Sequence, residues 1–355
     1  MTRFLLAGGG TAGHVNPLLA LADAIVADNS ENKVWALGTK EGLEANLVPQ
    51  RGYELLTVDR LPFPRKPSLY ALTFPLRFFR AVKQVKSYIK GNQIDVVVGF
   101  GGYASAPAYL AAKSLRIPSI VHEANALPGW ANKLGAKSAK AVGITFKSTQ
   151  MPNATFVGMP LRKEIEAIAN GADKEAARLH FGLDPDTITL LVTGGSLGAK
   201  RINETIEDSR RLLSAAGIQV LHIMGGRSEL PEVREKDYVR IAYCDRMDLA
   251  IAASSFAVSR AGASTVSEFA AVGLPAAYVP YPVGNGEQKL NVQDVVSGEG
   301  GLMVLDADFS TNYVAETLIP MISNSRALSE MAKKAKRSGV SDGTARLLAL
   351  VKGVL

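Results

Sequence analysis

The N-terminal stretch of this chain is a short apolar run that leads through glycines into a helix-like segment. Residues 4–7 are apolar, a run of glycines that ends at Gly13 follows, and residues 18–27 repeat apolar side chains at helical spacing. A strand, a glycine loop and a helix in this order direct backbone N–H groups and the positive end of the helix dipole at one point. We therefore expect an anion site at this loop. His14 lies at its mouth, where a neutral imidazole can take a proton from a bound substrate.

The same glycines satisfy the dinucleotide-binding pattern Gly8-x-Gly10-x-x-Gly13, which is a weak signal when it stands alone. That pattern is completed by an acidic residue at the end of the second strand, about 20 residues further on, which binds a ribose hydroxyl. Residues 34–39 read Val-Trp-Ala-Leu-Gly-Thr and contain no acidic residue. We therefore do not favour a nicotinamide-dependent enzyme.

Short apolar runs alternate with longer helix-patterned segments, which predicts parallel sheets built from strand–helix repeats. The second half begins the pattern again, because its first strand leads into a second glycine loop, Gly194–Gly198, and then into a helix. The expected fold is α/β, with two Rossmann-like domains that face each other across a cleft. The predicted strands are residues 3–7, 33–37, 54–58, 96–99, 119–121, 141–144, 155–157, 187–192, 219–224, 239–242, 256–259, 276–279 and 302–305.

At 355 residues the chain is long enough for two domains, each with its own core. We place the boundary near Gly158–Pro160, where a glycine and a proline interrupt the pattern. The expected domains are residues 1–159 and 160–340. A last helix in residues 341–355 is expected to return to the first domain.

The formal net charge of +7 indicates an anionic partner, such as a nucleotide, a nucleic acid or an acidic lipid surface. Cys244 is the only cysteine, which excludes an internal disulfide and a cysteine metal site and fits a reducing cytoplasm. We expect no secretory signal, because the first apolar run is too short. We also expect no membrane-spanning helix, because no stretch approaches about 18 apolar residues. Any contact with a membrane is therefore expected at its surface.

Residues 60–90 carry many cations and not one Asp or Glu, and apolar side chains lie between the cations. Such a mixture suits an anionic bilayer, where the acyl boundary takes the apolar groups and the lipid phosphates meet the cations. The alternatives are a helix that simply packs on the sheet through Phe78, Val82, Val85 and Ile89, and a nucleic-acid surface, for which the chain has no motif. The cations are Arg60, Arg65, Lys66, Arg77, Arg80, Lys83, Lys86 and Lys90. The expected membrane patch is drawn from the apolar residues between Leu61 and Phe79, mainly Leu69, Leu72, Phe74 and Phe79, with Arg77, Arg80 and Lys83.

Other polar and small residues lie at predicted strand ends, where open parallel sheets bind ligands. The second glycine loop holds Ser196 and resembles a phosphate cradle, although it lacks the Lys-Ser/Thr of a P-loop. Further on, Glu268 lies one turn inside a helix that starts near Ala263, where it can accept hydrogen bonds from a ribose diol or serve in a capping box. His122 can be a ligand contact or a satisfied histidine on a strand. The remaining histidines, His180 and His222, are expected to be structural.

The motifs together resemble the MurG family of N-acetylglucosaminyltransferases, in order and spacing along essentially the whole chain. They are Gly9–His14, Gly101–Tyr103, His122–Asn125, Gly194–Ser196, Ala263–Glu268 and Gln288. The resemblance implies a glycosyltransferase B fold. It also implies transfer of N-acetylglucosamine from UDP-N-acetylglucosamine to undecaprenyl-diphosphate-linked muramoyl pentapeptide, the step from lipid I to lipid II in peptidoglycan synthesis. The departures from the common pattern of the family are Leu197, Lys200 and Glu287.

The same resemblance implies the roles of individual residues. His14 is expected to be the catalytic base of an inverting transfer that uses no cofactor and no metal ion. The expected donor contacts are Thr11, Ala12, Gly13, Asn125, Arg162, Ser196, Cys244, Ala263, Ser264, Thr265, Val266, Ser267, Glu268 and Gln288. The expected contacts on the acceptor side are Gly101, Gly102, Tyr103, His122 and Glu123. The implied location is the cytoplasmic face of the bacterial plasma membrane, as a peripheral protein, with anionic lipid and proteins of wall synthesis and division as further partners.

Two other functions stay open on the residues alone. A UDP-N-acetylglucosamine epimerase shares the double-Rossmann architecture. It would need acid–base groups on both faces of the donor sugar and no membrane-facing segment, so residues 60–90 argue against it. A non-catalytic module that binds nucleotides or senses lipids is disfavoured, because His14 has no evident structural role.

Overall fold

The computed structural model describes residues 1–64 and 66–355, so Arg65 of the basic segment lies outside the described residues. The chain forms two compact units. Unit 1 contains residues 1–162 together with 342–355, and unit 2 contains residues 163–341. Each unit is built on its own seven-stranded sheet.

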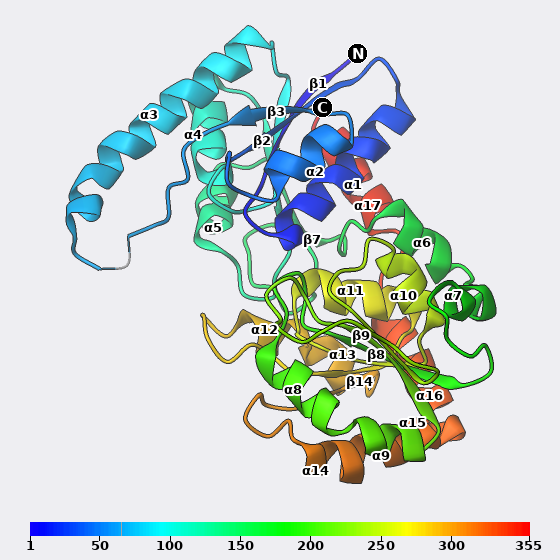
Figure 1. Ribbon diagram of the computed structural model, residues 1–355. Helices are drawn as coiled ribbons and strands as arrows, with labels where there is room; N and C mark the ends of the chain where they lie inside the picture. The colour runs from blue at the N-terminus through cyan, green and yellow to red at the C-terminus, as the bar shows by residue number, and fades with distance from the viewer. Residues whose placement is uncertain (65) are drawn as a thin grey trace. The chain divides into compact units, whose positions relative to one another are not determined.

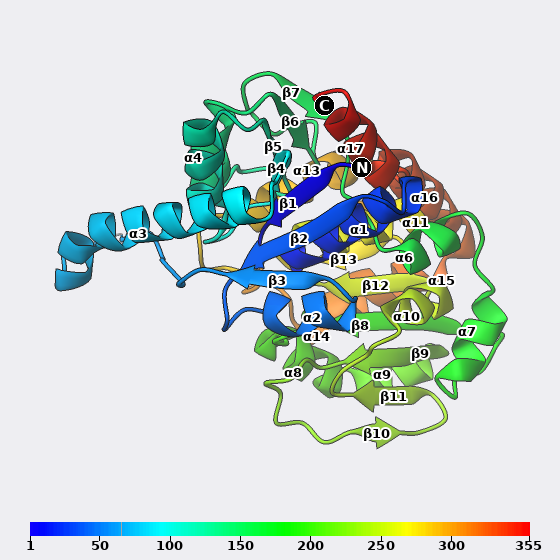
Figure 2. The same ribbon diagram turned by 90° about the horizontal axis from the view of Figure 1, so that it is seen from above.

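The sheet of unit 1 is parallel throughout, with strand order β3-β2-β1-β4-β5-β6-β7 (Figures 1 and 2). Helices cover both faces, which is why strands such as β4 are apolar at every position. The strands are β1 Arg3–Ala7, β2 Lys33–Gly38, β3 Glu54–Thr57, β4 Val96–Gly99, β5 Ser119–Glu123, β6 Ala141–Ile144 and β7 Ala154–Phe156. The helices are α1 Ala12–Asp28, α2 Glu44–Gln50, α3 Leu69–Gly91, α4 Ser105–Leu115, α5 Trp130–Ala136 and α17 Gly343–Lys352.

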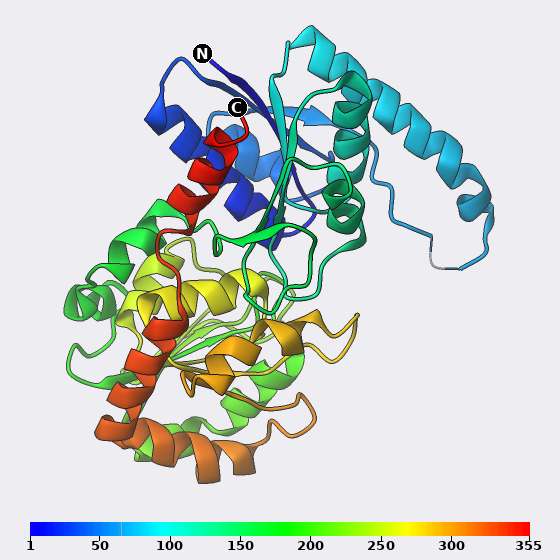
Figure 3. The same cartoon turned by 180° about the vertical axis from the view of Figure 1, so that it is seen from behind.

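The last helix, α17, packs in unit 1 although it comes from the end of the chain. It lies beside α1 and β6, as the red and blue helices of Figure 3 show. Leu347 and Val351 are fully buried in the same core as strand β1. The Thr344 hydroxyl lies 3.2 Å from both the N and the O of Leu161, and Lys352 pairs with Asp28 at 2.9 Å.

The sheet of unit 2 has the order β10-β11-β9-β8-β12-β13-β14, and all its pairs are parallel except β10 with β11. The two-residue strand β10 has no counterpart among the predicted strands. The strands are β8 Ile188–Thr193, β9 Ile218–Ile223, β10 Val233–Arg234, β11 Tyr238–Ile241, β12 Phe256–Ser259, β13 Ala276–Tyr278 and β14 Gly301–Met303. The helices are α6 Lys163–Ala169, α7 Lys174–His180, α8 Lys200–Asp208, α9 Arg210–Ala215, α10 Met247–Ala253, α11 Ala263–Val272, α12 Glu287–Asn291, α13 Gln293–Ser297, α14 Thr311–Tyr313, the π-helix Val314–Leu318, α15 Ile319–Ser323 and α16 Ser325–Ser338.

The predicted strands agree with the observed ones to within one or two residues, but the first helix begins earlier than expected. The helix predicted from Leu18 starts at Ala12, because Thr11 takes the extended backbone conformation of an N-cap. Pro17 is accommodated inside the helix. As a consequence, His14 lies in the first turn of α1 rather than in the loop before it.

Candidate active site

A buried carboxylate, which the sequence analysis did not predict as functional, fixes the first glycine loop. Glu44, at the start of α2, is fully buried. One carboxylate oxygen accepts from the backbone N–H and the hydroxyl of Thr39, both at 2.8 Å, and the other accepts from the N–H of Gly10 at 2.8 Å. The N–H of Gly8 donates to the carbonyl of Leu37. Two N–H groups of the predicted anion site are therefore occupied by the protein itself, which corrects that expectation for this part of the loop.

His14 is half-buried, and its Nδ1 atom lies 3.1 Å from the carbonyl oxygen of Gly9. A carbonyl oxygen can only accept, so Nδ1 carries the proton of this hydrogen bond. The hydroxyl of Thr11 is 3.3 Å from the same nitrogen. In the neutral ring Nε2 is then without a proton, which is the state that a general base requires.

A pocket of about 350 Å³ lies over this loop. It combines glycine backbone, hydroxyl groups, one imidazole, one carboxylate and one guanidinium. The Arg60 guanidinium stacks 5.3 Å from the centre of the Tyr103 ring. The lining residues are Gly9, Gly10, Thr11, His14, Thr39, Glu41, Gly42, Arg60, Gly102 and Tyr103. A polar ligand fits this lining.

The loop after β4 lies against the first glycine loop. Gly101 and Gly102 both have positive φ angles, of 97° and 79°. A Cβ atom on Gly102 would overlap the backbone of Gly9, and one on Gly101 would lie 3.1 Å from Nε2 of His14. These two glycines, expected as acceptor contacts, thus allow the two loops to approach each other. Tyr103, the third acceptor contact expected in this loop, contributes its side chain to the pocket.

His122 and Glu123 are buried in β5 and do not line the pocket, which corrects their expected role as acceptor contacts. Nε2 of His122 donates to the carbonyl of Gly158 at 3.0 Å. Burial lowers the pKa of His122 to about 4, so the ring is neutral. The Glu123 carboxylate accepts from the N–H groups of Asn125 and Gly129, at 2.9 and 3.0 Å. The Glu123 side chain thus holds the loop that carries Asn125, whereas the His122 side chain joins β5 to Gly158.

The second glycine loop, after β8, closes on itself. The N–H of Gly198 donates to the carbonyl of Gly195 at 2.9 Å, and the N–H of Gly195 to the Thr193 hydroxyl at 3.3 Å. A Cβ on Gly198 would overlap the carbonyl oxygen of Met224. Ser196 is exposed at the tip. The exposed Ser196 hydroxyl therefore lies in the loop that immediately precedes α8 in the chain.

The first turn of α11 follows β12 in unit 2. The N-cap is Gly262, so Glu268 is the sixth helical residue and forms no capping box, which removes that alternative. The Ser264 hydroxyl is buried and has no hydrogen-bond partner among the described residues. Ala263 and Val266 are buried. Thr265 and Ser267 are half-buried.

The remaining expected donor residues lie in both units. The Gln288 amide oxygen accepts from the N–H groups of Ala261 and Tyr281, at 3.2 and 2.9 Å, so it joins the start of α12 to the loops after β12 and β13. Cys244 is buried. Arg162 is the last residue of the first segment of unit 1.

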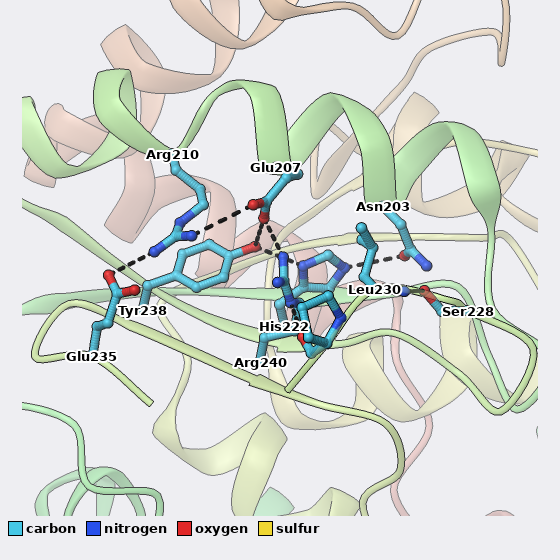
Figure 4. Close-up of polar contacts among 10 residues, drawn as sticks. Asn203, Glu207, Arg210, His222, Ser228, Leu230, Glu235, Tyr238 and Arg240 are labelled. Atoms are coloured by element: carbon cyan, nitrogen blue, oxygen red, sulfur yellow. Dashed lines mark hydrogen bonds and ion pairs between the residues drawn. The ribbon is translucent and has the colours of Figure 1, made fainter. Parts of the chain in front are cut away.

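A buried polar network behind α8 is built around His222 (Figure 4). The His222 ring bridges the Asn203 amide oxygen at 3.1 Å and the Tyr238 hydroxyl at 2.8 Å. Glu207 forms an ion pair with Arg240 next to them. Burial, together with the charge of Arg240, lowers the pKa of His222 to about 3. The network anchors α8 to the sheet, which fits the expectation that His222 is structural.

The two halves of α3 have different surroundings, and its N-terminal half projects beyond the sheet (Figures 1 and 2). The C-terminal half packs on the sheet through Val82, Val85 and Ile89, as the alternative interpretation expected. In the N-terminal half, Leu69 and Phe79 are 83% and 70% exposed. We define the α3 patch as Leu69, Leu72, Leu76 and Phe79 with the exposed cations Arg77, Arg80 and Lys83.

Phe74 and Leu61, two apolar residues of the expected membrane segment, are less exposed than the α3 patch. Phe74 stacks with Phe78 at 5.7 Å and meets Phe63 edge-on at 5.7 Å, and Trp130 completes this aromatic cluster. Leu61 is buried. Buried Leu61 is therefore outside the α3 patch, whereas half-buried Phe74 lies in the aromatic cluster and its contact with a membrane stays a prediction. No helix in residues 1–64 and 66–355 combines the length and the apolar composition that crossing a membrane requires.

Family sequence models match most of the chain. The glycosyltransferase family 28 N-terminal domain matches residues 4–144, and the family 28 C-terminal domain matches residues 189–347. The chain is therefore a glycosyltransferase with the two-domain fold of the B class.

Curated relatives narrow the class. A UDP-N-acetylglucosamine–N-acetylmuramyl-(pentapeptide) pyrophosphoryl-undecaprenol N-acetylglucosamine transferase of Leifsonia xyli subsp. xyli is 54% identical, over 99% of this chain and 98% of the relative. The protein of the same name from Streptomyces coelicolor is 46% identical, over 98% of this chain and 96% of the relative. Among solved structures, MurG of Acinetobacter baumannii is similar with a TM-score of 0.80 and 25% identity, over 99% and 100% of the two chains. This chain belongs to the MurG family.

The same fold is shared by an enzyme of another class. A putative UDP-N-acetylglucosamine 2-epimerase of Listeria monocytogenes has a TM-score of 0.71 at 14% identity, over 99% of this chain and 96% of the other. That likeness concerns the fold alone, because the level of identity is low.

Proposed function

We propose that this chain transfers N-acetylglucosamine from UDP-N-acetylglucosamine to the muramoyl sugar of undecaprenyl-diphosphate-linked pentapeptide. The observation that carries the proposal is the state of His14, whose Nδ1–H is held by the Gly9 carbonyl beside a pocket of about 350 Å³. The full-length identity to enzymes of that name supports the choice of substrates.

In the reaction, an acceptor hydroxyl attacks the anomeric carbon of the donor sugar. Nε2 of His14 takes the hydroxyl proton while the new C–O bond forms. The bond from the anomeric carbon to the diphosphate oxygen breaks, and UDP leaves with the bonding electrons. Attack opposite to the leaving group inverts the anomeric carbon and gives a β-linkage.

The donor is assigned mainly to unit 2. The exposed Ser196 hydroxyl, the unpartnered Ser264 hydroxyl and the first turn of α11 offer donors to a diphosphate, where a helix N-terminus also stabilises negative charge. Glu268, on the next turn, is the proposed partner of the ribose diol. In this proposal, these hydrogen-bond donors and the helix N-terminus stabilise the negative charge of the departing UDP, and no metal ion is invoked.

The membrane side is assigned to the α3 patch. Its exposed leucines and Phe79 can enter the acyl boundary, and its cations can meet lipid phosphates. Such a contact would place the protein at the cytoplasmic face of the plasma membrane, where a lipid-linked acceptor is found.

A transfer assay tests the function directly. The protein is mixed with radiolabelled UDP-N-acetylglucosamine and an undecaprenyl-diphosphate muramoyl-pentapeptide acceptor, and the label in the lipid phase is counted. Transfer to lipid that depends on the acceptor is expected. Conversion of the nucleotide sugar without an acceptor would instead indicate an epimerase, and binding without either reaction would indicate a non-catalytic module.

A further inference from the structure

The side chain of Glu44 is enclosed by glycines that come from three parts of unit 1. A Cβ atom on Gly9, Gly38 or Gly42 would overlap this side chain, so each of the three positions leaves room for it. The carboxylate is fully buried and accepts three hydrogen bonds, two from Thr39 and one from Gly10. A buried carboxylate is tolerated where such donors satisfy both oxygens.

The hydrogen bonds of Glu44 and His14 meet on one peptide group. The N–H of Gly10 donates to Glu44 at 2.8 Å, and the carbonyl of Gly9 accepts from Nδ1 of His14 at 3.1 Å. These N–H and C=O groups belong to the same planar amide, on opposite sides of it. The carboxylate, the peptide and the imidazole therefore form one continuous chain of hydrogen bonds, in which each bond polarises the next.

We propose that Glu44 is a positioning residue that acts on His14 through the Gly9–Gly10 peptide. The peptide orientation that Glu44 fixes presents the Gly9 carbonyl to Nδ1, and this holds the tautomer in which Nε2 is free of a proton. Without the carboxylate, the peptide loses the partner of its N–H group and can rotate away from the ring. The inference rests on the proposed role of His14 as the base.

The test replaces Glu44 by its isosteric amide and follows both catalysis and the imidazole. Glu44→Gln keeps the volume but turns one acceptor oxygen into an NH₂ donor. The remaining oxygen cannot accept from Gly10 and Thr39 together, so one of these two N–H groups loses its acceptor. We expect kcat of the transfer reaction to fall on the order of 10- to 100-fold, while KM for UDP-N-acetylglucosamine stays within about twofold. In ¹⁵N NMR spectra of the histidine side chains, His14 should be protonated at Nδ1 in the unsubstituted protein and lose this preference in E44Q.

Two further variants serve as controls. Glu54→Gln changes a carboxylate of strand β3 in unit 1 that accepts from Trp35 Nε1 at 2.9 Å, and the new amide oxygen can still accept, so kcat should not change. His14→Ala measures the base itself and identifies the His14 signals. If H14A keeps its turnover, the proposed base is wrong; if H14A is inactive while folded E44Q has normal kcat, only the role of Glu44 is wrong.

A fall of kcat in E44Q with an unchanged His14 tautomer would also overturn the role of Glu44. Should E44Q fail to fold, Glu44→Asp makes the comparison, because it keeps the charge on a side chain one methylene shorter and so weakens the contact to Gly10. E44D is expected to lower kcat and to shift the tautomer in the same direction. An Nε2-protonated His14 in the unsubstituted protein would overturn the inference without any variant.

Discussion

Three histidines of this chain differ in what surrounds the ring. His14 is half-buried and lines a pocket, with one nitrogen bonded to a backbone carbonyl. His122 and His222 are fully buried. Burial lowers the pKa of His122 to about 4 and that of His222 to about 3, so both rings stay neutral and structural at neutral pH. The proposed base, His14, therefore differs from the other two histidines in being partly exposed to solvent and lining a pocket.

Replacing His14 by alanine should remove most of the transfer activity. We expect kcat to fall on the order of 10²- to 10⁴-fold, because no other group takes the hydroxyl proton. The affinity for UDP-N-acetylglucosamine should stay within about twofold. Single-turnover kinetics and nucleotide-sugar binding measure the two quantities. His180→Ala, at an exposed position of unit 2, is the control, and an H14A protein as active as this control would remove His14 from the chemistry.

His222 should make the protein less stable in acid. Its pKa is about 3 in the folded chain and 6.5 in the unfolded chain, so below 6.5 the unfolded chain binds a proton that the folded chain excludes. Stability is therefore lost as the pH falls through this window. His222→Gln should flatten the dependence by up to about 1.4 kcal/mol per pH unit. Urea unfolding at several pH values measures it; an unchanged slope would show that the ring does not titrate in this way.

At the scale of elements, the two glycine loops look alike in sequence but have different surroundings. In the loop before α1, the Gly10 N–H is taken by the Glu44 carboxylate. In the loop before α8, the exposed Ser196 hydroxyl is presented at the tip. A fixed carboxylate repels a second anion at close range, so the diphosphate of the donor is better placed at the second loop.

The α3 patch should bind anionic bilayers. Replacing Leu69, Leu72 and Phe79 by serine removes three exposed apolar groups without opening the core, so the fold should persist. Binding to phosphatidylglycerol vesicles should fall on the order of tenfold or more, because each of these side chains contributes roughly 1.5–3 kcal/mol when the bilayer buries it. Vesicle sedimentation measures it.

Exposed leucines of unit 2 provide a matched control for this test. Leu179 and Leu212 are 58% and 44% exposed, and their replacement by serine should leave vesicle binding unchanged. If the triple variant of α3 binds as well as this control, the patch does not contact lipid.

Over the chain as a whole, the residues form two compact units, and the last helix packs in the first of them. Leu347 and Val351 of α17 are buried with Val157 and Ile120 of unit 1. The end of the chain therefore stabilises the unit in which the chain begins.

Leu347→Ala should destabilise unit 1 by about 2–5 kcal/mol, because it leaves a cavity in a closed core. Leu355→Ala, at an exposed position, should change stability by less than about 0.5 kcal/mol. Denaturant unfolding, with fluorescence from Trp35 and Trp130 of unit 1, measures the effect. Equal stability of the two variants would show that α17 contributes little to that core.

The α/β class, nearly all the strands and the family were predicted from the amino-acid sequence. Short-range sequence patterns indicate these features, because a buried parallel strand is a run of apolar residues and a glycine loop is a local motif. The two-residue strand β10 and the early start of α1 were not predicted. The strand depends on its pairing with β11 and the helix start on the N-cap at Thr11, and neither leaves a periodic pattern in the sequence.

The polar residues that share a site could not be predicted, because the folded chain brings them together from distant segments. Glu44 is 34 residues from Gly10, and no local pattern joins them, yet folding brings its carboxylate onto the loop. His122 and Glu123 occupy a motif that looks functional but lie beneath the surface, because residues of a fully buried strand point into the core on both faces. Chemistry at a site depends on contacts between distant segments, and those contacts exist only once the chain has folded.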